Sequence, residues 1–437
     1  MGASAQRLNT PETAQLKRQD WLIIALVGAA HSCSHFFQLV IPTLYLSLAA
    51  EFGYDFAQLG LLASIFFLMS SIGQASSGFV VDRVGPTPVL WFGLGCFVAS
   101  GVLISASNGY AMLALAAAVG GAGNSVFHPV DYSILNHRVS AARLGHGFST
   151  HGLTGNLGWA LAPVFMAAFI HLANWRVAAI AASALVAIVL LFTWWGRDLL
   201  SGNTDTLGRT NHEDAMSKDA SASGSNGDLS QKGAMATLRA LVMQPALWGA
   251  FLFFACTSIS LSAIQNYTIP MLDTVYGVDK VMAGSALSGY MLAAALGMFA
   301  GGFVVSSTPR SEFTVFVSLV LAAAFFALLA TGMVGSPVAL VLIAMAGFFS
   351  GVAGPSRDML IRRVTPKGAT GTVYGLVYSG MDIGASLAPV AFGLMLDVGL
   401  TRGPWVGAAV SFVVAALLAM AVGRAAAARN APSASMA

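Results

Sequence analysis

The chain has 437 residues, of which 57% are hydrophobic and only 9% are charged. Soluble globular proteins carry about 25% charged residues, so this chain has too few charges to cover a water-facing surface. The composition therefore excludes an ordinary soluble protein and indicates that most of the surface faces lipid. The formal charge of +3 is small and gives no sign of nucleic-acid binding.

The apolar runs of the chain predict twelve transmembrane helices, because about 20 apolar residues cross the hydrocarbon core of a bilayer. The first run is too long for the core of a signal peptide and is not followed by a small-residue cleavage site, so we expect it to stay in the mature protein. The expected spans are 21–48, 55–81, 88–107, 109–137, 144–171, 174–196, 245–271, 280–305, 312–333, 336–361, 369–396 and 404–423.

Cationic residues predict the orientation of these spans, since Lys and Arg concentrate in cytoplasmic connections. Most of them fall on the side that holds both ends of the chain. The other side holds Arg176, Lys280 and Arg402. We therefore expect both termini to be cytoplasmic.

Four sequence elements recur once, in the same order and at a nearly constant spacing. The recurring pairs are 41–44 with 269–272, 78–81 with 302–305, Gly121 and Pro129 with Gly347 and Pro355, and 161–164 with 387–390. Six spans per half is an even number, so the halves are parallel repeats about an axis along the membrane normal. The predicted fold is an all-α membrane protein with two pseudo-symmetric six-helix bundles, residues 21–196 and 244–423.

The segments outside the bundles are polar. Residues 197–243 are rich in Ser, Gly, Asn, Asp and Lys, which predicts a flexible cytoplasmic linker that lets the two bundles move relative to each other. Residues 1–20 and 424–437 are predicted to be cytoplasmic tails.

Prolines inside the spans follow the same repeat. A proline removes a backbone donor and bends a helix, so we expect matched kinks that give both halves the same curved helices. Such kinks either shape the packing alone or let the two mouths of a cavity open in turn. The matched prolines are Pro42 with Pro270, Pro129 with Pro355, and Pro163 with Pro389.

A short motif, SGFVVDRVGP, follows the second span. Gly78 permits close helix contact, and Gly85 permits a tight turn. Asp82 suits the positive N-terminus of a neighbouring helix, and Arg83 can pair with a carboxylate across the interface. The motif resembles the loop signature of the major facilitator superfamily, which latches the two halves in the outward-open state.

Two departures from that signature are visible. Pro86 and Thr87 stand where the family has basic residues, and the second half keeps Gly302 but has Ser306 in place of Asp82. The resemblance to the superfamily therefore depends on the motif together with the twelve spans, the duplication and the central linker.

Residues 30–64 and 119–163 resemble the fosmidomycin-resistance family of drug exporters. The matching features are Ser34-His35, the run 125–129, His146-Gly147, and Gly155-Asn156-Leu157-Gly158. The resemblance covers roughly residues 20–170 and implies export of a small molecule driven by proton entry. The family tends to place an acid directly after the His-Pro pair. Here Val130 stands there and Asp131 follows, about 100° further around a helix.

Ionisable residues inside the spans are functional candidates, because a charge in hydrocarbon is costly. Histidine changes its charge between about pH 5 and 8, so an imidazole could load a proton on one side and release it on the other. We predict that proton coupling uses His35, His128 and Asp382. The alternative for each histidine is a neutral ring hydrogen-bonded between helices.

The superfamily resemblance implies that spans 1, 4, 7 and 10 line a central cavity, with help from 2, 5, 8 and 11. His31 and His35 are four residues apart and share a helix face. The predicted cavity residues are His31, His35, Gln38, His128, His151, Asn156, Gln265, Asn266 and Tyr267.

A gate is predicted at the cytoplasmic ends of spans 4 and 10. Asp131 and Arg357 occupy the same repeat position, and Asp358 follows. Opposite charges at symmetric positions could pair across the cavity and close its inner mouth in one state, although Asp131 could instead bridge to nearby loops, including Arg83. The predicted gating residues are Gly78, Asp82, Arg83, Gly85, Asp131, Arg357 and Asp358.

Three of the histidines in the spans could also form a site for a transition metal. His31, His35 and His128 could bind zinc, iron, nickel or copper as cargo. Cys33 points about 200° away from the histidine pair and cannot join them. We predict no resident metal and no cofactor, and we expect the three cysteines, Cys33, Cys96 and Cys256, to be small buried hydrophobes.

These observations predict a secondary active transporter that works by alternating access. The leading hypothesis is proton-coupled efflux of a drug or small organic anion. Import of a small metabolite is an alternative, because a fold does not set the direction of transport. Transport of a transition metal or its chelate by the membrane histidines is another. The chain has no Gly-x-Ser-x-Gly, HExxH or phosphate-loop motif, so no enzyme is expected.

The expected partners are a small molecule, protons and lipid, with no nucleic acid. We expect a monomer in a bacterial inner (plasma) membrane.

Overall fold

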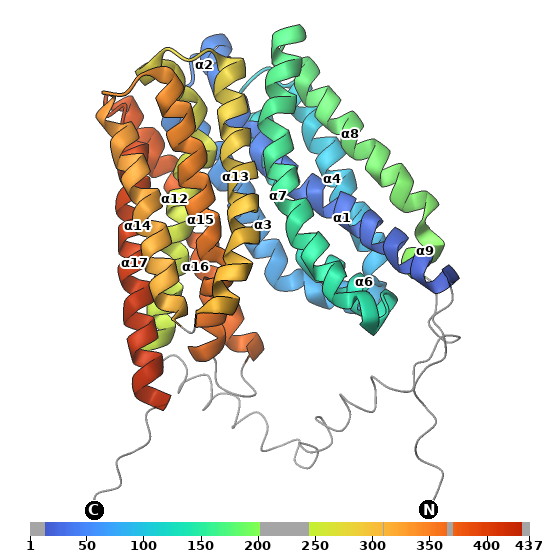
Figure 1. The fold of residues 1–437 in the computed structure, drawn as a ribbon. Coiled ribbons are helices and arrows are strands. Elements are labelled where there is room, and N and C mark those ends of the chain that lie inside the picture. Colours follow the sequence, from blue (N-terminus) through green and yellow to red (C-terminus); the bar gives the residue numbers. More distant parts are fainter. Residues whose placement is uncertain (1–13, 202–243, 309, 365–369, 431–437) are drawn as a thin grey trace, which may run out of the picture.

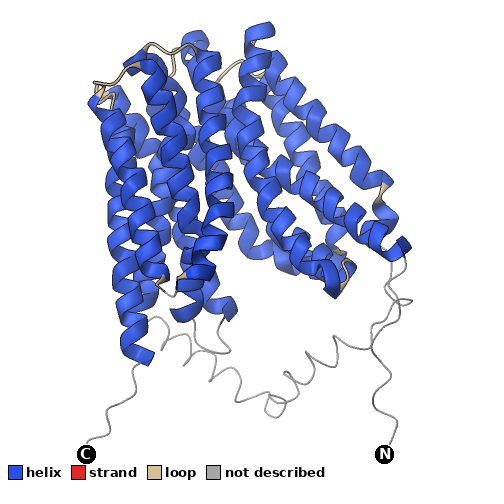
Figure 2. Cartoon of the chain, viewed as in Figure 1, coloured by secondary structure: helices blue, strands red, loops and turns tan. Residues whose placement is uncertain are grey.

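The structure, a computed structural model, describes residues 14–201, 244–308, 310–364 and 370–430. These residues form helices joined by short connections, and they contain no strand (Figure 2). The helices of the first half are α1 (Ala14–Thr43), α2 (Tyr45–Phe52), α3 (Phe56–Val84), α4 (Pro86–Ala106), α5 (Tyr110–Asn124), α6 (Phe127–Arg138), α7 (Ala141–Leu172), α8 (Trp175–Trp195) and α9 (Arg197–Ser201). Those of the second half are α12 (Pro245–Tyr276), α13 (Lys280–Ser307), α14 (Ser311–Thr331), α15 (Ser336–Val364), α16 (Thr370–Asp397) and α17 (Gly403–Asn430).

Twelve segments within the described residues are long and apolar enough to span a membrane, which confirms the predicted number. The first span consists of α1 and α2 and covers Gln15–Phe52, and the fourth consists of α5 and α6 and covers Tyr110–Arg138. Two of the predicted tails contain helix. Helix α1 begins inside the predicted 1–20 tail, and α17 runs to Asn430 inside the predicted 424–437 tail. Of the predicted linker, residues 202–243 lie outside the described part of the chain.

The two halves stand side by side and meet mainly at one end (Figure 1). The start of α1 and the end of α17 lie at the same end of the molecule, here called the terminal face. The opposite end, here called the distal face, holds α2 and the connection from α12 to α13. The halves contact each other through α3 with α16 and through α7 with α13, and they diverge toward the terminal face.

The contacts between the halves repeat the sequence symmetry. Gly60 of α3 packs against the carbonyl oxygen of Pro389 in α16. Gly284 and Pro163 are the repeat equivalents of Gly60 and Pro389, and they pack together in the same way. An added Cβ at Gly284 would lie 3.1 Å from the carbonyl oxygen of Pro163. Each half therefore offers a second-span glycine to a fifth-span proline of the other half.

Two of the matched proline pairs differ in their position relative to helix ends. Pro42 immediately precedes the end of α1, whereas Pro270 lies inside the unbroken α12. Pro129 follows the break between α5 and α6, whereas Pro355 lies inside the unbroken α15. Pro129 cannot donate to the carbonyl of Ser125, and that carbonyl accepts a hydrogen bond from Ser77 of α3 instead, at 3.2 Å.

Candidate functional site

Four histidines and one aspartate gather inside the first half, and we call them the histidine–aspartate cluster. His31 and His35 come from α1, His128 and Asp131 from α6, and His151 from α7. The break before α6 and the close approach of α7 to α1 bring these three helices together. The sequence predicted all four histidines as cavity residues, whereas Asp131 was assigned to a gate.

Asp131 is the centre of the cluster. Its side chain is fully buried, and its Oδ2 lies 2.9 Å from Nδ1 of His31 and 3.1 Å from Nε2 of His151. The two imidazoles stack with their centroids 3.5 Å apart and their planes at 24°. A buried carboxylate needs a partner, and a proton on either imidazole supplies one. The arrangement can therefore hold a proton away from solvent.

The remaining two histidines extend the cluster. The ring centroid of His31 is 4.6 Å from that of His35, as their shared helix face predicted, and 5.4 Å from that of His128. His128 is exposed, while His31 and His151 are buried. His128 therefore joins the buried carboxylate to accessible space.

The Gly-Asn-x-Gly element of α7 makes room for these rings. A Cβ at Gly155 would lie 2.9 Å from Cε1 of His35 and 3.1 Å from Nε2 of His31. A Cβ at Gly158 would clash with the carbonyl oxygen of Ser32 on α1. Any larger residue at these two positions would push α7 away from α1 and open the cluster.

A second buried network lies directly beside the cluster, centred on Asn124 at the end of α5. Its Oδ1 accepts hydrogen bonds from Ser34 at 2.7 Å and from Gln38 at 3.2 Å, and its Nδ2 donates to Ser70 of α3 at 2.8 Å. Trp159 donates to Gln38 at 2.9 Å and places its ring 4.2 Å from that of His35. Sequence reasoning identified Gln38 but missed Asn124 and Trp159, although a buried amide in a span was a usable signal.

Two predicted residues lie outside the cluster. Asp382 of α16 is half-buried and interacts with Ser71 of α3, so it belongs to the seam between the halves. Asn156 donates to the carbonyl of Gly152, one turn earlier in its own helix, at 2.9 Å. Their roles in proton coupling and in the cavity stay predictions.

The three predicted residues of the seventh span are buried near the distal face. Oδ1 of Asn266 accepts a hydrogen bond from Tyr45 at 2.9 Å. Tyr267 donates to the carbonyl of Pro389 and also approaches that of Phe56, at 3.3 Å. In this conformation Asn266 and Tyr267 hold the halves together, Gln265 is buried beside them, and substrate contact by any of the three stays a prediction.

The predicted gating residues meet different outcomes. Gly85 adopts a φ of +86° between α3 and α4, which confirms the tight turn. The expected close helix contact at Gly78 is wrong for this conformation, because an added Cβ there would meet nothing within 4 Å. The reason is that α3 ends at the terminal face, where the halves diverge, and Asp82 and Arg83 are exposed there.

The pairing of Asp131 with Arg357 is not the arrangement that the structure holds. Asp131 contacts His31 and His151 of its own half. Arg357 donates to Asp358 at 2.9 Å, and its guanidinium lies 5.2 Å from the ring centroid of Phe254. The pair across the cavity stays a prediction about another conformation.

Arg357 lines a pocket of about 480 Å³ inside the second half. Thr257 of α12 and Ser350 of α15 also line it, and Ser350 is hydrogen-bonded to Tyr290 of α13 at 3.0 Å. This pocket occupies the repeat position of the histidine–aspartate cluster, since Arg357 corresponds to Asp131 and Ser350 to Asn124. One half thus carries titratable groups where the other carries a permanent cation.

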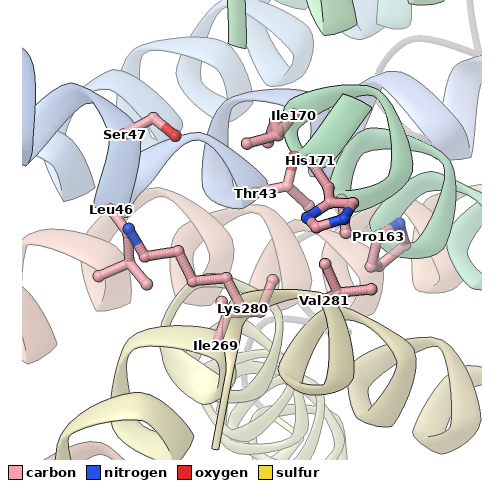
Figure 3. Close-up of a pocket in the computed structure, with 10 residues that line it drawn as sticks. Thr43, Leu46, Ser47, Pro163, Ile170, His171, Ile269, Lys280 and Val281 are labelled. Carbon is pink, nitrogen blue, oxygen red and sulfur yellow. The ribbon is translucent and has the colours of Figure 1, made fainter. Parts of the chain in front are cut away.

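A second pocket, of about 530 Å³, lies between the halves at the distal face and is called the distal pocket (Figure 3). It is lined by Thr43 and Ser47 of the first span, by Pro163 and His171 of α7, and by Lys280 of α13. Figure 3 shows the imidazole of His171 and the extended side chain of Lys280 among these residues.

The cluster also contains a possible metal-binding set. His31, His128 and His151 each offer one ligand atom, and these atoms lie within 4.8 Å of one another. The sequence had placed His35 in this set, and the structure places His151 there instead.

Twelve spans in two repeated halves, joined at one face and carrying buried ionisable groups, define a membrane transport protein. A sequence profile described as "Major Facilitator Superfamily" matches residues 24–281 and 260–435. The chain belongs to the Major Facilitator Superfamily. It is an integral membrane protein and not an enzyme, as its sequence predicted.

Relatives of the chain are named for different molecules. This chain is 26% identical over 363 residues to the "Probable L-galactonate transporter" of Escherichia coli K12. The aligned region covers 80% of this chain and 78% of that protein. The chain is 33% identical over 176 residues to the "Fosmidomycin resistance protein" of the same organism, covering 40% of this chain and 43% of that protein. A "Probable nitrate/nitrite transporter NarK2" of Mycobacterium tuberculosis is 25% identical over 82% of this chain and 85% of its own length.

Solved structures share the fold. A bacterial homologue of the human lysosomal transporter Spinster, in an inward-facing and unoccupied conformation, matches with a TM-score of 0.71 at 16% identity, over 94% of this chain and 96% of that chain. A POT family transporter in complex with 5-aminolevulinic acid matches with a TM-score of 0.70 at 12% identity, over 93% and 96%.

Proposed function

We propose that the protein is a proton-coupled exporter of a small organic anion, and that the histidine–aspartate cluster is its proton site. The observation that carries this proposal is the fully buried Asp131 held between His31 and His151. Ionisable groups at membrane depth are costly and are typical of proton relays.

The cluster fits alternating access because one of its members is accessible. A proton that reaches His128 from one face can pass to the stacked His31 and His151 and to Asp131, which it neutralises. Neutralising a buried carboxylate removes the need for its imidazole contacts, so α6 and α7 are free to shift relative to α1. Rocking of the halves then exposes the proton to the other face.

Two observations support an anionic substrate. Two of the relatives are named as probable transporters of L-galactonate and of nitrate and nitrite, which are anions. The pocket of the second half offers the guanidinium of Arg357 beside Thr257 and Ser350, and a guanidinium suits carboxylate or phosphonate groups. The proton site and the anion site would then lie in different halves.

Export is supported by the fosmidomycin-resistance relative, which is 33% identical to this chain over 176 residues. The L-galactonate relative is 26% identical over 363 residues. Import of a sugar acid is the second candidate, because the L-galactonate relative matches over 80% of this chain. Transport of a transition metal is the third, and it is favoured by the ligand atoms of His31, His128 and His151.

We also place the protein in a bacterial inner membrane as two bundles joined by the 197–243 segment, with both termini in the cytoplasm. The distribution of Lys and Arg supports this orientation. The terminal face is then the cytoplasmic face, and the structure is closed on the outside.

The test is transport by purified protein in liposomes that contain a pH-sensitive dye. Fosmidomycin and L-galactonate are the probes, and a matched set of liposomes without protein is the control. We expect one probe to move protons in the opposite direction to itself, and a protonophore to abolish its accumulation. Accumulation that persists after the proton gradient is dissipated would contradict the proposal, and zinc transport in the same liposomes would favour the metal alternative.

A further inference from the structure

The two seams between the halves differ at one pair of equivalent positions. Asp397 at the end of α16 corresponds by the repeat to His171 of α7, and Phe56 at the start of α3 corresponds to Lys280 at the start of α13. The flanking positions are alike: Asp55 caps α3 and the equivalent Asp279 caps α13. A carboxylate on one seam is therefore replaced by an imidazole on the other.

Asp397 holds the first seam at the distal face. Its Oδ1 accepts a hydrogen bond from the backbone N–H of Phe56, and its Oδ2 accepts one from that of Ala57, both at 2.8 Å. The carboxylate of one half thus caps the first turn of a helix from the other half, where the helix dipole favours negative charge. Tyr267 adds to this seam, because its hydroxyl donates to the carbonyl of Pro389 and approaches that of Phe56.

The second seam has a cavity instead of a carboxylate. His171 and Lys280 both line the distal pocket of about 530 Å³, with Val281, the next residue of α13, beside them (Figure 3). Thr43 and Ser47 of the first span also line the pocket, and Thr43 lies beside His171 (Figure 3). His171 and Lys280 are exposed, so the pocket can be reached from solvent at the distal face.

The residues that line the pocket include one lysine, Lys280, one histidine, His171, and no acid. Lys280 carries an ammonium group, and His171 adds one or two hydrogen-bond donors. The nearest acid along the chain is Asp279, whose Oδ1 already accepts hydrogen bonds from the backbone of Val281 and of Met282, both at 3.0 Å. The pocket therefore offers a cation and hydrogen-bond donors to a small anion.

We propose that the distal pocket binds a small carboxylate- or phosphate-bearing anion. This anion would link α7 to α13 across the second seam, as the carboxylate of Asp397 links α16 to α3 across the first. An anion held by Lys280 and His171 would link α7 of one half to α13 of the other. Because those contacts exist only when the halves are closed at this face, the anion stabilises the closed conformation. The inference does not depend on proton coupling.

The first experiment measures thermal unfolding of the purified protein in detergent, with inorganic phosphate or succinate compared with chloride at equal ionic strength. We expect both probes to raise the melting temperature in a saturable way and Lys280→Gln to weaken the apparent affinity at least tenfold. Arg402→Gln is the control for charge at the same face, because Arg402 contacts the carbonyl of Thr331 and does not line the pocket. An equal response in Lys280→Gln and wild type would overturn the proposal.

The second experiment places a carboxylate in the pocket by substitution. His171→Asp reproduces the residue found at position 397, and it should pair with Lys280 and close the seam without added anion. We expect a higher melting temperature in chloride and no further rise with phosphate. A variant that still responds to phosphate like the wild type would contradict the proposed site.

A third measurement separates the two sources of such an anion. Proteoliposomes receive phosphate only at the distal face while transport of labelled fosmidomycin or L-galactonate is followed. Competition that Lys280→Gln relieves would show that the pocket holds the anionic group of the substrate. A response of the melting temperature without competition would show that it holds a free anion. Failure of proton coupling would leave all three results unaffected.

Discussion

Gly60 of α3 lies directly against the carbonyl oxygen of Pro389 in α16, and the repeat reproduces this contact as Gly284 against Pro163. Each contact joins a second span of one half to a fifth span of the other. Both pairs lie in the seams at which the halves stay together while they diverge at the terminal face. We therefore regard the two glycine–proline contacts as the pivots about which the halves rock.

Gly60→Ala tests the first pivot. An alanine Cβ would clash with the Pro389 carbonyl, which is backbone and cannot move alone, so we expect the closed distal face to lose about 1–3 kcal/mol. The measurement is cross-linking of cysteines placed across the seam. Gly289→Ala in α13 is the control, because its Cβ would meet nothing within 4 Å. Equal cross-linking in both variants would contradict the assignment of a pivot.

Gly155→Ala tests the packing that forms the histidine–aspartate cluster. The new methyl would lie 2.9 Å from Cε1 of His35 and displace the ring, at a cost of about 1–3 kcal/mol. We expect substrate-driven proton movement to fall about tenfold, measured with a pH dye in liposomes. Gly152→Ala on the same helix, where a Cβ meets open space, should leave it unchanged.

Asn124→Leu removes the centre of the network that joins α1, α3 and α5. Hydrogen bonds between membrane helices contribute about 0.6 kcal/mol each, so the loss of three should destabilise the protein by about 1–2 kcal/mol. A lower melting temperature is the expected result. Asn156→Leu is the matched control, because Asn156 bonds to its own helix. A control that loses as much stability as Asn124→Leu would count against the network.

Asp397→Ala removes the carboxylate that caps α3 from the other half. Loss of a helix cap costs about 1 kcal/mol, so the distal face should open about fivefold more often. The readout is cross-linking of cysteines placed across the α3–α16 seam in a background without the three native cysteines, and it should fall in the variant. Asp55→Ala also removes a cap from α3, but within the same half, and should leave the cross-linking unchanged.

The sequence predicted the architecture well because lipid imposes simple rules. Apolar length sets the number of spans, and the internal repeat sets the two halves. The shared face of His31 and His35 follows from helical geometry and is confirmed. These features depend on local patterns, which can be read without knowing which helices are neighbours.

The site was harder to predict because its key contacts depend on tertiary packing. Asp131 was assigned to a gate from its repeat position opposite Arg357, but the break before α6 turns its carboxylate toward His31 and His151. Asp382 was grouped with the histidines and instead faces Ser71 in the seam. The replacement of Asp397 by His171 was visible in the repeat, but its meaning requires the seam contacts.

Asp131 is the proposed proton carrier, and one substitution at this position tests that role. Asp131→Asn keeps the shape of the side chain but cannot take up and release a proton in the same range. Purified variant and wild type are compared in liposomes for exchange of labelled fosmidomycin or L-galactonate across the membrane and for proton movement driven by that substrate. We expect Asp131→Asn to retain exchange and to lose substrate-driven proton movement. Full proton movement in the variant, with exchange like that of the wild type, would contradict it.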